Sequence, residues 1–427
     1  MLAGIFKPAQ CVGFFFWSDF VRYGIPYKGS KNTIAKKIID FLPEAETLVD
    51  ICAGGCAITH AALEHMEQNP LTKKWNRVIA NDINPIPLRL FGNAVNGKYA
   101  NEKRWISRED FFRLKEKDEY VKFCWSFGNN GIGYLYAKEI EPWKRALHYA
   151  YVLGDNRFLS EICGEVPKDN IRQWIRDNEK DIKEKYISWY KEQWKLAHNQ
   201  AEGAPIELQE STEEVLIALK KELQEYLRKA LQLSGKRACD VDKHLGTNGM
   251  AGHYFGKSQW EFPTPEAYIK LKEILPLDRE YPWHLLFLQS LERLQSLQSL
   301  QRLESLERLQ SLQSLESLES LERLQRLEMD YRDVQLPDGC VVYCDPPYAG
   351  TNGYGLHKSA FDQEAFWNWA RKCERLLFIS EYSAPVDFVP IVELPHRSRL
   401  SATTNNSVTE RLFVHESRYN ELKTRLI

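Results

Sequence analysis

The residues best suited to chemistry in this sequence are Asp345-Pro346-Pro347-Tyr348, which directly follow the apolar run 341–344. Two consecutive prolines fix the backbone and remove two N–H donors, so a strand must end there with carbonyl oxygens left to accept hydrogen bonds. The Asp345 carboxylate and the Pro346 carbonyl can both accept from an exocyclic amine, and a planar base can stack on the Tyr348 ring. An ordinary strand-to-loop turn is the alternative, but the aromatic residue after the prolines favours a catalytic corner.

A second stretch suits the binding of a cofactor. The apolar run 47–51 turns through Gly54 and Gly55 into a helix of small residues, an arrangement in which the backbone can approach a ligand closely. Asp50 lies at the end of this expected strand, where its carboxylate can meet an ammonium group. Asp82 follows the next apolar run, at the position where an acid usually bonds ribose hydroxyls in nucleotide-binding α/β folds.

The stretch before the glycine turn is basic. The loop Gly29-Ser30-Lys31 precedes an expected helix over residues 34–42. Backbone N–H groups at a helix N-terminus, together with a lysine, suit a carboxylate. His60 lies on the helix expected after the turn, where a histidine is more often a packing residue than a catalyst.

Length and composition restrict what these motifs can belong to. A chain of 427 residues with 43% hydrophobic content predicts a soluble globular protein of two or three domains. The formal net charge of −2 gives no global attraction to nucleic acid, so any DNA-binding surface has to be local. The nine cysteines show no metal-binding spacing, which predicts reduced thiols, no metal and a cytoplasmic protein. The apolar run 14–17 is too short to span a membrane, and residues 1–21 are interpreted as a dispensable extension.

In their order along the chain, the motifs at 27–31, 50–56, 82 and 345–348 resemble those of one enzyme family. This family is the alpha group of S-adenosylmethionine-dependent DNA adenine-N6 methyltransferases, which includes bacterial and phage adenine methylases. The similarity covers about residues 22–89 and 325–427. One departure concerns the glycine loop, because Cys56 stands at the position of the family's second glycine.

The resemblance implies an α/β, Rossmann-like methyltransferase sheet, mostly parallel with helices on both faces, built from residues 22–89 and 325–427. It implies S-adenosyl-L-methionine as the cofactor and double-stranded DNA as the partner. The implied cofactor contacts are Tyr27, Gly29, Lys31, Asp50, Cys52, Ala53, Gly54, Gly55, Asp82, Asp330 and Asp345. The implied catalytic residues are Asp345, Pro346, Pro347 and Tyr348.

Residues 90–284 lie where this family carries its target-recognition domain, and their pattern is mainly helical. The loop 124–134 is rich in glycine, polar and aromatic residues, a composition suited to contact with nucleic acid. Residues 241–260 resemble a helix-turn-helix, although packing explains their aromatic residues equally well. The polar loop 397–406 can clamp phosphates, and a solvated hairpin explains it as well. The candidate DNA contacts are Asn129, Asn130, Asn248, His253, Lys257, Gln259, Arg397 and Arg399.

Every third residue from Leu285 to Leu327 is leucine. A three-residue period slips by about 60° per repeat around an α-helix, so no single face stays apolar. A 3₁₀ helix would align the leucines, but long 3₁₀ runs are rare. Residues 285–328 are therefore expected to form an inserted helical arm about 60 Å long, and self-association through this arm is left open.

The favoured function is site-specific methyl transfer to the N6 amine of an adenine flipped out of DNA. Asp345 and Pro346 would accept the amine hydrogens, and Tyr348 would be the stacking platform. Alternatives are a cytosine-N4 methyltransferase, a protein glutamine methyltransferase and a non-enzymatic repeat scaffold on a decayed enzyme. The sequence leaves open the target DNA sequence, the oligomeric state and the presence of a cognate nuclease.

Overall fold

The computed structural model describes residues 22–198, 213–247, 249–256, 260–297, 300–348, 361–397 and 407–426. The chain divides into two compact units, the first comprising Met1–Leu135 with Glu304–Ile427 and the second Tyr136–Leu303. Residues 90–135 and 304–324 therefore belong to the first unit, outside the segments 22–89 and 325–427 expected from the sequence. The extension 1–21 lies outside the described residues.

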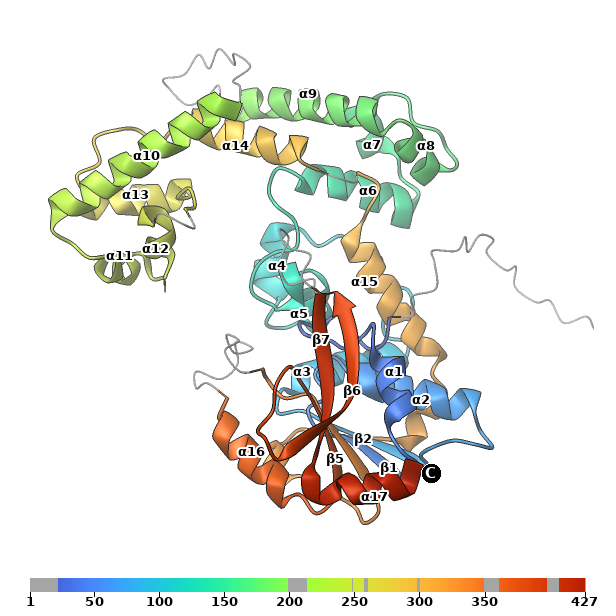
Figure 1. Cartoon of the computed structure of the whole chain (residues 1–427). Coiled ribbons are helices and arrows are strands. Elements are labelled where there is room, and N and C mark those ends of the chain that lie inside the picture. The colour runs from blue at the N-terminus through green and yellow to red at the C-terminus, as the bar shows by residue number, and fades with distance from the viewer. Residues whose placement is uncertain are drawn as a thin grey trace, which may run out of the picture. The chain divides into compact units, whose positions relative to one another are not determined.

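The first unit is built on a seven-stranded sheet with the order β3-β2-β1-β4-β5-β7-β6 (Figure 1). The strands are β1 (Thr47–Asp50), β2 (Arg77–Asn81), β3 (Leu324–Leu327), β4 (Val341–Cys344), β5 (Leu376–Glu381), β6 (Phe388–Arg397) and β7 (Ser407–His415). The neighbouring strands in the series β3-β2-β1-β4-β5 are parallel to one another. Strand β7 is antiparallel to both β5 and β6. A mixed α/β fold with a mostly parallel sheet is thus confirmed.

The central strands are short apolar runs because both of their faces are covered. Every residue of β1, β4 and β5 is buried, as is usual for parallel strands with helices against the sheet. In the register of the sheet, Asp50 at the end of β1 lies beside Ala80 of β2 and Tyr343 of β4. The carboxyl ends of these three strands therefore meet at one edge of the sheet, where ligands bind in open α/β folds.

Helices surround this sheet. Those of the first unit are α1 (Ala35–Phe41), α2 (Ala57–Gln68), α3 (Pro85–Val95), α4 (Arg108–Leu114), α5 (Glu119–Cys124), α15 (Glu304–Gln313), α16 (Gln363–Lys372) and α17 (Glu416–Leu426). Phe366 and Ala370 of α16 pack in one cluster with Val49, Val342 and Ile379 of the sheet. The helix expected over 34–42 is α1, and the helix expected after the glycine turn is α2.

The second unit is entirely helical in its described residues. Its helices are α6 (Glu141–Leu153), α7 (Arg157–Cys163), α8 (Ile171–Asp177), α9 (Glu179–His198), α10 (Glu213–Ser234), α11 (Ala238–Leu245), α12 (Met250–Phe255), α13 (Pro265–Ile274) and α14 (Trp283–Gln295). Leu227, Val241, Leu271 and Phe287 are buried in its main core cluster. Across both units, no helix among the described residues has the length and apolar composition to span a membrane.

The leucine repeat does not form one long arm, which corrects the expectation for residues 285–328. It is divided among α14, α15, two 3₁₀ turns at Ser314–Ser317 and Ser320–Arg323, and strand β3. An α-helix cannot keep leucines of period three on one face, so a single long helix could not bury them all on one side. Leu312, Leu315 and Leu318 are buried, and Leu315 lies in a 3₁₀ turn, whose three residues per turn match the repeat. The end of the repeat supplies the edge strand of the sheet.

Candidate active site

The ends of β1, β2 and β4 open into one cavity of about 460 Å³. Its walls come from the loop before α1, the glycine turn after β1, the segment after β2, residues 330–332 and the corner after β4. All the cofactor contacts expected from the sequence line it: Tyr27, Gly29, Lys31, Asp50, Cys52, Ala53, Gly54, Gly55, Asp82, Asp330 and Asp345. Asp345 thus shares a cavity with residues more than 260 positions earlier in the chain.

The glycine turn is packed closely against the preceding loop. A Cβ atom on Gly55 would lie 2.7 Å from Tyr27 Cβ, so only glycine fits at this position without a shift. Ile25 N–H donates to the Gly55 carbonyl at 2.8 Å, which joins the two loops. Cys56 has φ 58° and ψ 31°, the left-handed conformation, and is buried as the N-cap of α2. The family's second glycine position therefore keeps a glycine-like backbone, although a non-glycine residue there costs about 1–2 kcal/mol.

His60 has a packing role, as the sequence indicated. Its side chain is buried, and its Nδ1 accepts a hydrogen bond from Gly24 N–H at 2.9 Å. Burial lowers the pKa of His60 to about 4. His60 therefore binds the backbone of the loop before α1 as a neutral imidazole, and it is not among the residues that line the cavity.

Two carboxylates bind backbone N–H groups of the glycine turn and of the helix that follows it. Asp82 accepts from Gly54 N–H and from Asn84 N–H, both at 2.8 Å. Asp50 accepts from the Thr59 N–H at 3.2 Å and from the Thr59 hydroxyl at 2.7 Å. Burial raises the pKa of Asp82, and burial raises the pKa of Asp50 to about 7. Asp50 and Asp82 both line the cavity, where carboxylate oxygens can accept hydrogen bonds from a ligand.

Asp345 lies in a buried cluster of charged and hydroxyl groups. Lys31 Nζ donates to Asp345 Oδ1 at 2.8 Å and also donates to the Tyr348 hydroxyl. The Tyr348 hydroxyl in turn donates to Glu410 Oε1 at 2.6 Å, and the Ser380 hydroxyl donates to the same oxygen at 2.7 Å. Lys31 Nζ lies 3.7 Å from Glu410 Oε1, so one ammonium faces two carboxylates.

The electrostatics of this cluster follow from burial and from its charges. Burial raises the pKa of Asp345 to about 6, with Lys31 opposing and Glu410 adding to the rise. Burial alone would lower the pKa of Lys31, but Asp345 and Glu410 outweigh it and hold that pKa above its usual value. Near neutral pH, Asp345 is therefore an ionised acceptor held by a protonated lysine.

The predicted corner residues do not all reach the cavity. Asp345 and Pro347 line it, whereas Pro346 and Tyr348 are not among its lining residues. The Tyr348 ring packs on Tyr382 with a centroid distance of 4.7 Å, and Lys31 Nζ lies 4.7 Å from its centre. Gln363 Nε2 donates to the Pro347 carbonyl at 2.6 Å and ties the corner to α16.

Several residues of the site were not found from the sequence. Glu410 and Ser380 lie in strands β7 and β5, and the sequence pattern described these only as apolar strands. Arg332 lines the cavity and is paired with Asp330 at 2.8 Å. The signal available was the charged residue Glu410 close to the apolar run 412–414, because a charge that is buried needs a partner.

The candidate DNA contacts that the structure describes belong to different units of the chain. Asn129 and Asn130 lie in the loop after α5 in the first unit, whereas His253 lies on α12 in the second. Arg397 ends β6, with its side chain outside the description. The remaining candidates lie outside the described residues: Asn248, Lys257, Gln259 and Arg399.

The loop that carries Asn129 and Asn130 is well anchored. Arg308 donates to the carbonyls of Cys124 and Ser126 at 2.9 and 2.8 Å. Ser126 and Tyr134 form an antiparallel bridge across the loop. Phe127 and Ile132 are 68% and 64% exposed, so the tip of an anchored loop presents apolar side chains to solvent.

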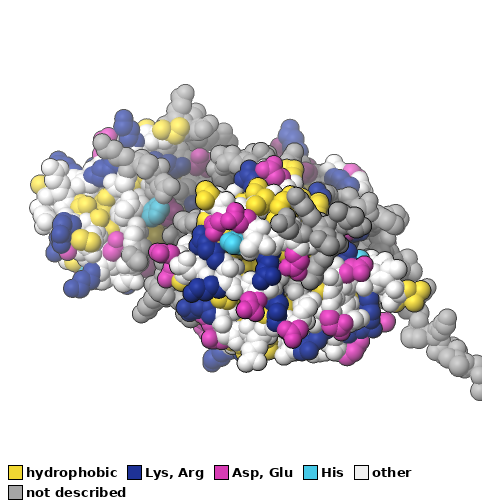
Figure 2. Space-filling view, turned by 60° about the horizontal axis from the view of Figure 1, so that its bottom comes forward, with side chains coloured by type: hydrophobic (Ala, Val, Ile, Leu, Met, Phe, Trp, Pro, Cys, Tyr) yellow, Lys and Arg dark blue, Asp and Glu magenta, His cyan; other side chains and the backbone are white. Residues whose placement is uncertain are grey.

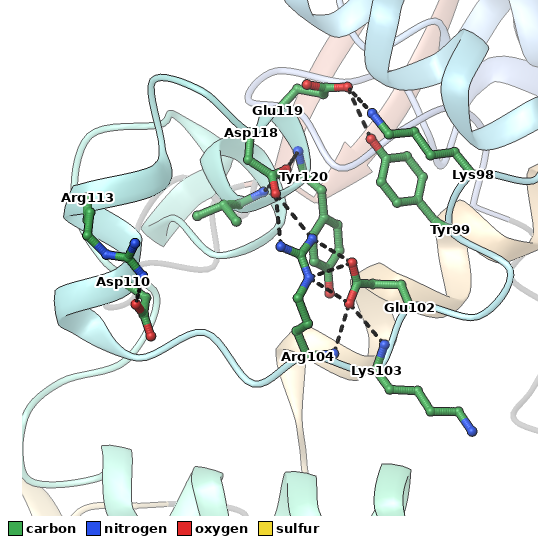
Figure 3. A network of polar contacts seen from close by, with 11 residues as sticks. Lys98, Tyr99, Glu102, Lys103, Arg104, Asp110, Arg113, Asp118, Glu119 and Tyr120 are labelled. Carbon is green, nitrogen blue, oxygen red and sulfur yellow. Dashed lines mark hydrogen bonds and ion pairs between the residues drawn. The ribbon is translucent and has the colours of Figure 1, made fainter.

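The basic residues near this loop are mostly paired with acids. Figure 3 shows Arg104 between Glu102 and Asp118, with distances of 2.6 and 3.1 Å. Lys98 is likewise paired with Glu119 at 3.1 Å. On the face seen in Figure 2, basic and acidic side chains are interspersed.

A mostly parallel sheet with a glycine turn after β1 and an acid after β2 is typical of nucleotide-binding α/β folds. The chain belongs to the D12 class N6 adenine-specific DNA methyltransferase family, whose model matches residues 27–263, more than half of the 427 residues. It is therefore an adenine-specific DNA methyltransferase. The match includes Tyr27 and Asp82 but ends before Asp345. A search of the curated proteins found no match.

Proposed function

We propose that the protein transfers a methyl group from S-adenosylmethionine to the N6 amine of an adenine flipped out of double-stranded DNA at a specific sequence. The observation that carries this proposal is the shared cavity, in which Asp345 lies with the glycine turn and Asp82. A nucleoside site and an acceptor for an exocyclic amine within one cavity are what such a transfer requires.

The cavity fits S-adenosylmethionine by its chemistry. Gly54 and Gly55 let the backbone of the turn pack closely against Tyr27, and the acceptor Asp82 suits ribose hydroxyls. The Ser30 hydroxyl in the cavity wall is buried without a hydrogen-bond partner, so it has capacity for a polar ligand atom. Asp50 and Asp330 supply acceptors for ammonium and amine groups. When bound, S-adenosylmethionine supplies an electrophilic methyl group on a sulfonium.

Asp345 and Pro346 act on the adenine amine. The amine is a poor nucleophile because its lone pair is delocalised into the ring. The two N–H groups of the amine donate hydrogen bonds to the Asp345 carboxylate and the Pro346 carbonyl. These hydrogen bonds draw electron density onto the nitrogen. Lys31 occupies Oδ1 of Asp345, which leaves Oδ2 for the amine and fixes the plane of the carboxylate.

Tyr348 is the stacking platform for the flipped base. The amine is inaccessible inside a duplex, so the base has to leave the helix, at a cost of a few kcal/mol that stacking helps to offset. The hydroxyl of Tyr348 is held by Lys31 and Glu410. A ring fixed at its far end loses little freedom when a base stacks on it.

The helical second unit is the target-recognition domain in this proposal, and the loop after α5 in the first unit is a separate candidate DNA contact. The α11 and α12 helices flank a turn in which Asp242 accepts from the Thr247 hydroxyl at 2.7 Å and from Ala251 N–H at 3.0 Å. A turn fixed in this way supports a helix-turn-helix reader, with His253 on its second helix. The candidates Asn248, Lys257, Gln259, Arg397 and Arg399 remain part of this proposal.

Expression in a bacterial host without DNA methylation, followed by sequencing of its genome for modified bases, tests the proposal. N6-methyladenine confined to one sequence context supports it and identifies the target. N4-methylcytosine, or a genome without any modified base despite soluble expression, contradicts it.

A further inference from the structure

Glu410 is a buried charge that the transfer described above does not use. It is 1% exposed and lies on β7, the antiparallel neighbour of β5. Strand β5 in turn pairs with β4, which leads into Asp345. Three adjacent strands thus bring Glu410, Ser380 and the Asp345 corner to one place in the sheet.

The contacts of Glu410 fix the groups behind Asp345. Its Oε1 accepts from the Tyr348 hydroxyl at 2.6 Å and from the Ser380 hydroxyl at 2.7 Å. Because the single hydroxyl proton of Tyr348 is given to Glu410, the same oxygen is left to accept from Lys31. The hydrogen bonds therefore run in one direction from Lys31 through Tyr348 to Glu410.

The negative charge of Glu410 also competes with Asp345 for the Lys31 ammonium. The ammonium lies 2.8 Å from Asp345 and 3.7 Å from Glu410, and all three side chains are largely removed from water. With Glu410 absent, Lys31 would be neutralised by Asp345 alone and would bind it more strongly. An Asp345 carboxylate bound more strongly by a lysine is a weaker acceptor for an amine.

We propose that Glu410 is a positioning residue for methyl transfer, which holds the Tyr348 hydroxyl and shares Lys31 with Asp345 so that Asp345 remains a strong acceptor for the adenine amine. This inference rests on the proposed function. In this proposal Glu410 does not touch the base or the donor, and it acts through Lys31, through Tyr348 and through the effect of its charge on Asp345.

The test compares Glu410→Gln with the wild-type protein in steady-state transfer to DNA over a range of pH. The amide can still accept from Tyr348 and Ser380, but it lacks the charge that draws Lys31. We expect kcat to fall by about tenfold or more, as when a group that orients a reacting ligand is removed, with KM for S-adenosylmethionine nearly unchanged.

The pH profile separates this role from a structural one. Asp345 must be ionised to accept the amine, so activity is lost as the pH falls through its pKa of about 6, a value that burial raises and to which Glu410 adds. Removing the negative charge lowers that pKa, so the acid limb of the kcat profile should move to lower pH in Glu410→Gln. The ionisable groups facing Asp345 are Lys31, Asp50, Tyr343, Tyr348, Tyr382 and Glu410, with the thiols of Cys52 and Cys344.

Glu393→Gln is the matched control. Glu393 lies on the neighbouring strand β6, is 61% exposed and pairs with Arg411 at 2.8 Å, so its replacement should leave kcat and the pH profile as in the wild type. Tyr348→Phe covers the case in which Glu410→Gln does not fold. It removes only the hydroxyl between Lys31 and Glu410, so its kcat should also fall. If Glu410→Gln folds, the two losses in kcat should not add in the double variant.

Wild-type kcat and an unmoved acid limb in a folded Glu410→Gln protein would overturn the inference. A lower melting temperature with an unmoved acid limb would also overturn it, because this would be a structural role. Wild-type protein that fails to methylate adenine would instead overturn the proposed function, and this inference with it.

Discussion

Lys31 and Asp345 are 314 positions apart in the sequence, yet the lysine ammonium donates to the aspartate carboxylate at 2.8 Å. Lys31 precedes α1, in the N-terminal part of the chain that also contains the glycine turn. Asp345 follows β4 and comes after the helical unit and the leucine repeat in the sequence. The contact joins the part of the cavity that suits a nucleoside to the part that suits an amine. Changes at either end of the cavity can therefore be tested separately for binding and for transfer.

Gly55→Ala should weaken the binding of S-adenosylmethionine by about tenfold or more, because overpacking at a close contact costs about 1–3 kcal/mol. The new Cβ would lie 2.7 Å from Tyr27 Cβ and 3.2 Å from the Ile25 carbonyl oxygen, so the wall of the cavity has to shift. Isothermal titration calorimetry measures the affinity.

Gly252→Ala is the control for this change, since a Cβ there meets no atom within 4 Å. It should bind the donor like the wild type. Equal affinities for Gly55→Ala and Gly252→Ala would show that the donor is not bound at the glycine turn.

Asp50→Asn should reduce the dependence of stability on pH. Burial raises the pKa of Asp50 to about 7 in the folded protein, above the value of about 3.9 in an unfolded chain. The folded state therefore holds this proton more tightly, and the contribution of Asp50 to stability is present at about pH 4 and is lost as the pH rises to about 7 and above. Asparagine does not titrate, so the free energy of unfolding at pH 8 should rise relative to the wild type, by on the order of a few kcal/mol.

Urea unfolding without ligand at pH 5 and pH 8 measures this difference. Asp338→Asn, at a side chain that is 99% exposed, is the control and should keep the wild-type dependence. If the Asp50→Asn and wild-type proteins lose stability equally between these pH values, the pKa of Asp50 is not raised in the folded protein.

Leu312→Ala should lower the free energy of unfolding by about 2–5 kcal/mol, as is usual for a leucine in a packed core. Leu312 is 0% exposed within α15, although it belongs to a repetitive sequence. Leu306→Ala, at a half-buried leucine of the same helix, should cost less. Chemical denaturation of both variants makes the comparison, and an unchanged stability for Leu312→Ala would mean that the repeat is a free arm after all.

Much of the first unit could be predicted from the sequence because its central strands are short apolar runs that end in distinctive residues. Asp50, Asp82 and Asp345 each follow such a run, and parallel pairing brings these ends to one edge of the sheet. The glycine turn could also be predicted, since only glycine permits its close approach to Tyr27. The family match confirms the adenine methyltransferase resemblance on which the function rested.

The leucine repeat and Glu410 could not be predicted for a common reason. Local pattern does not say which part of a low-complexity segment finds a partner, and here Leu324–Leu327 pairs with β2 as an edge strand. Glu410 precedes an apolar run, and its role depends on Lys31 and Tyr348, which are distant in the sequence. Long-range pairing of this kind leaves no periodic signal along the chain.

The most direct test of the central claim is the rate of methyl transfer to adenine N6 by Asp345→Ala, measured together with its affinity for S-adenosylmethionine. Asp338→Ala, at the exposed site before β4, is the control, and Asp345→Asn replaces the alanine variant if that protein does not fold. Because Asp345 accepts the amine hydrogen, transfer should fall by about a thousandfold, in the range found when a group that stabilises the transition state is removed, while the donor still binds and the melting curve stays cooperative. Transfer within a fewfold of wild type in a folded Asp345 variant would contradict the account.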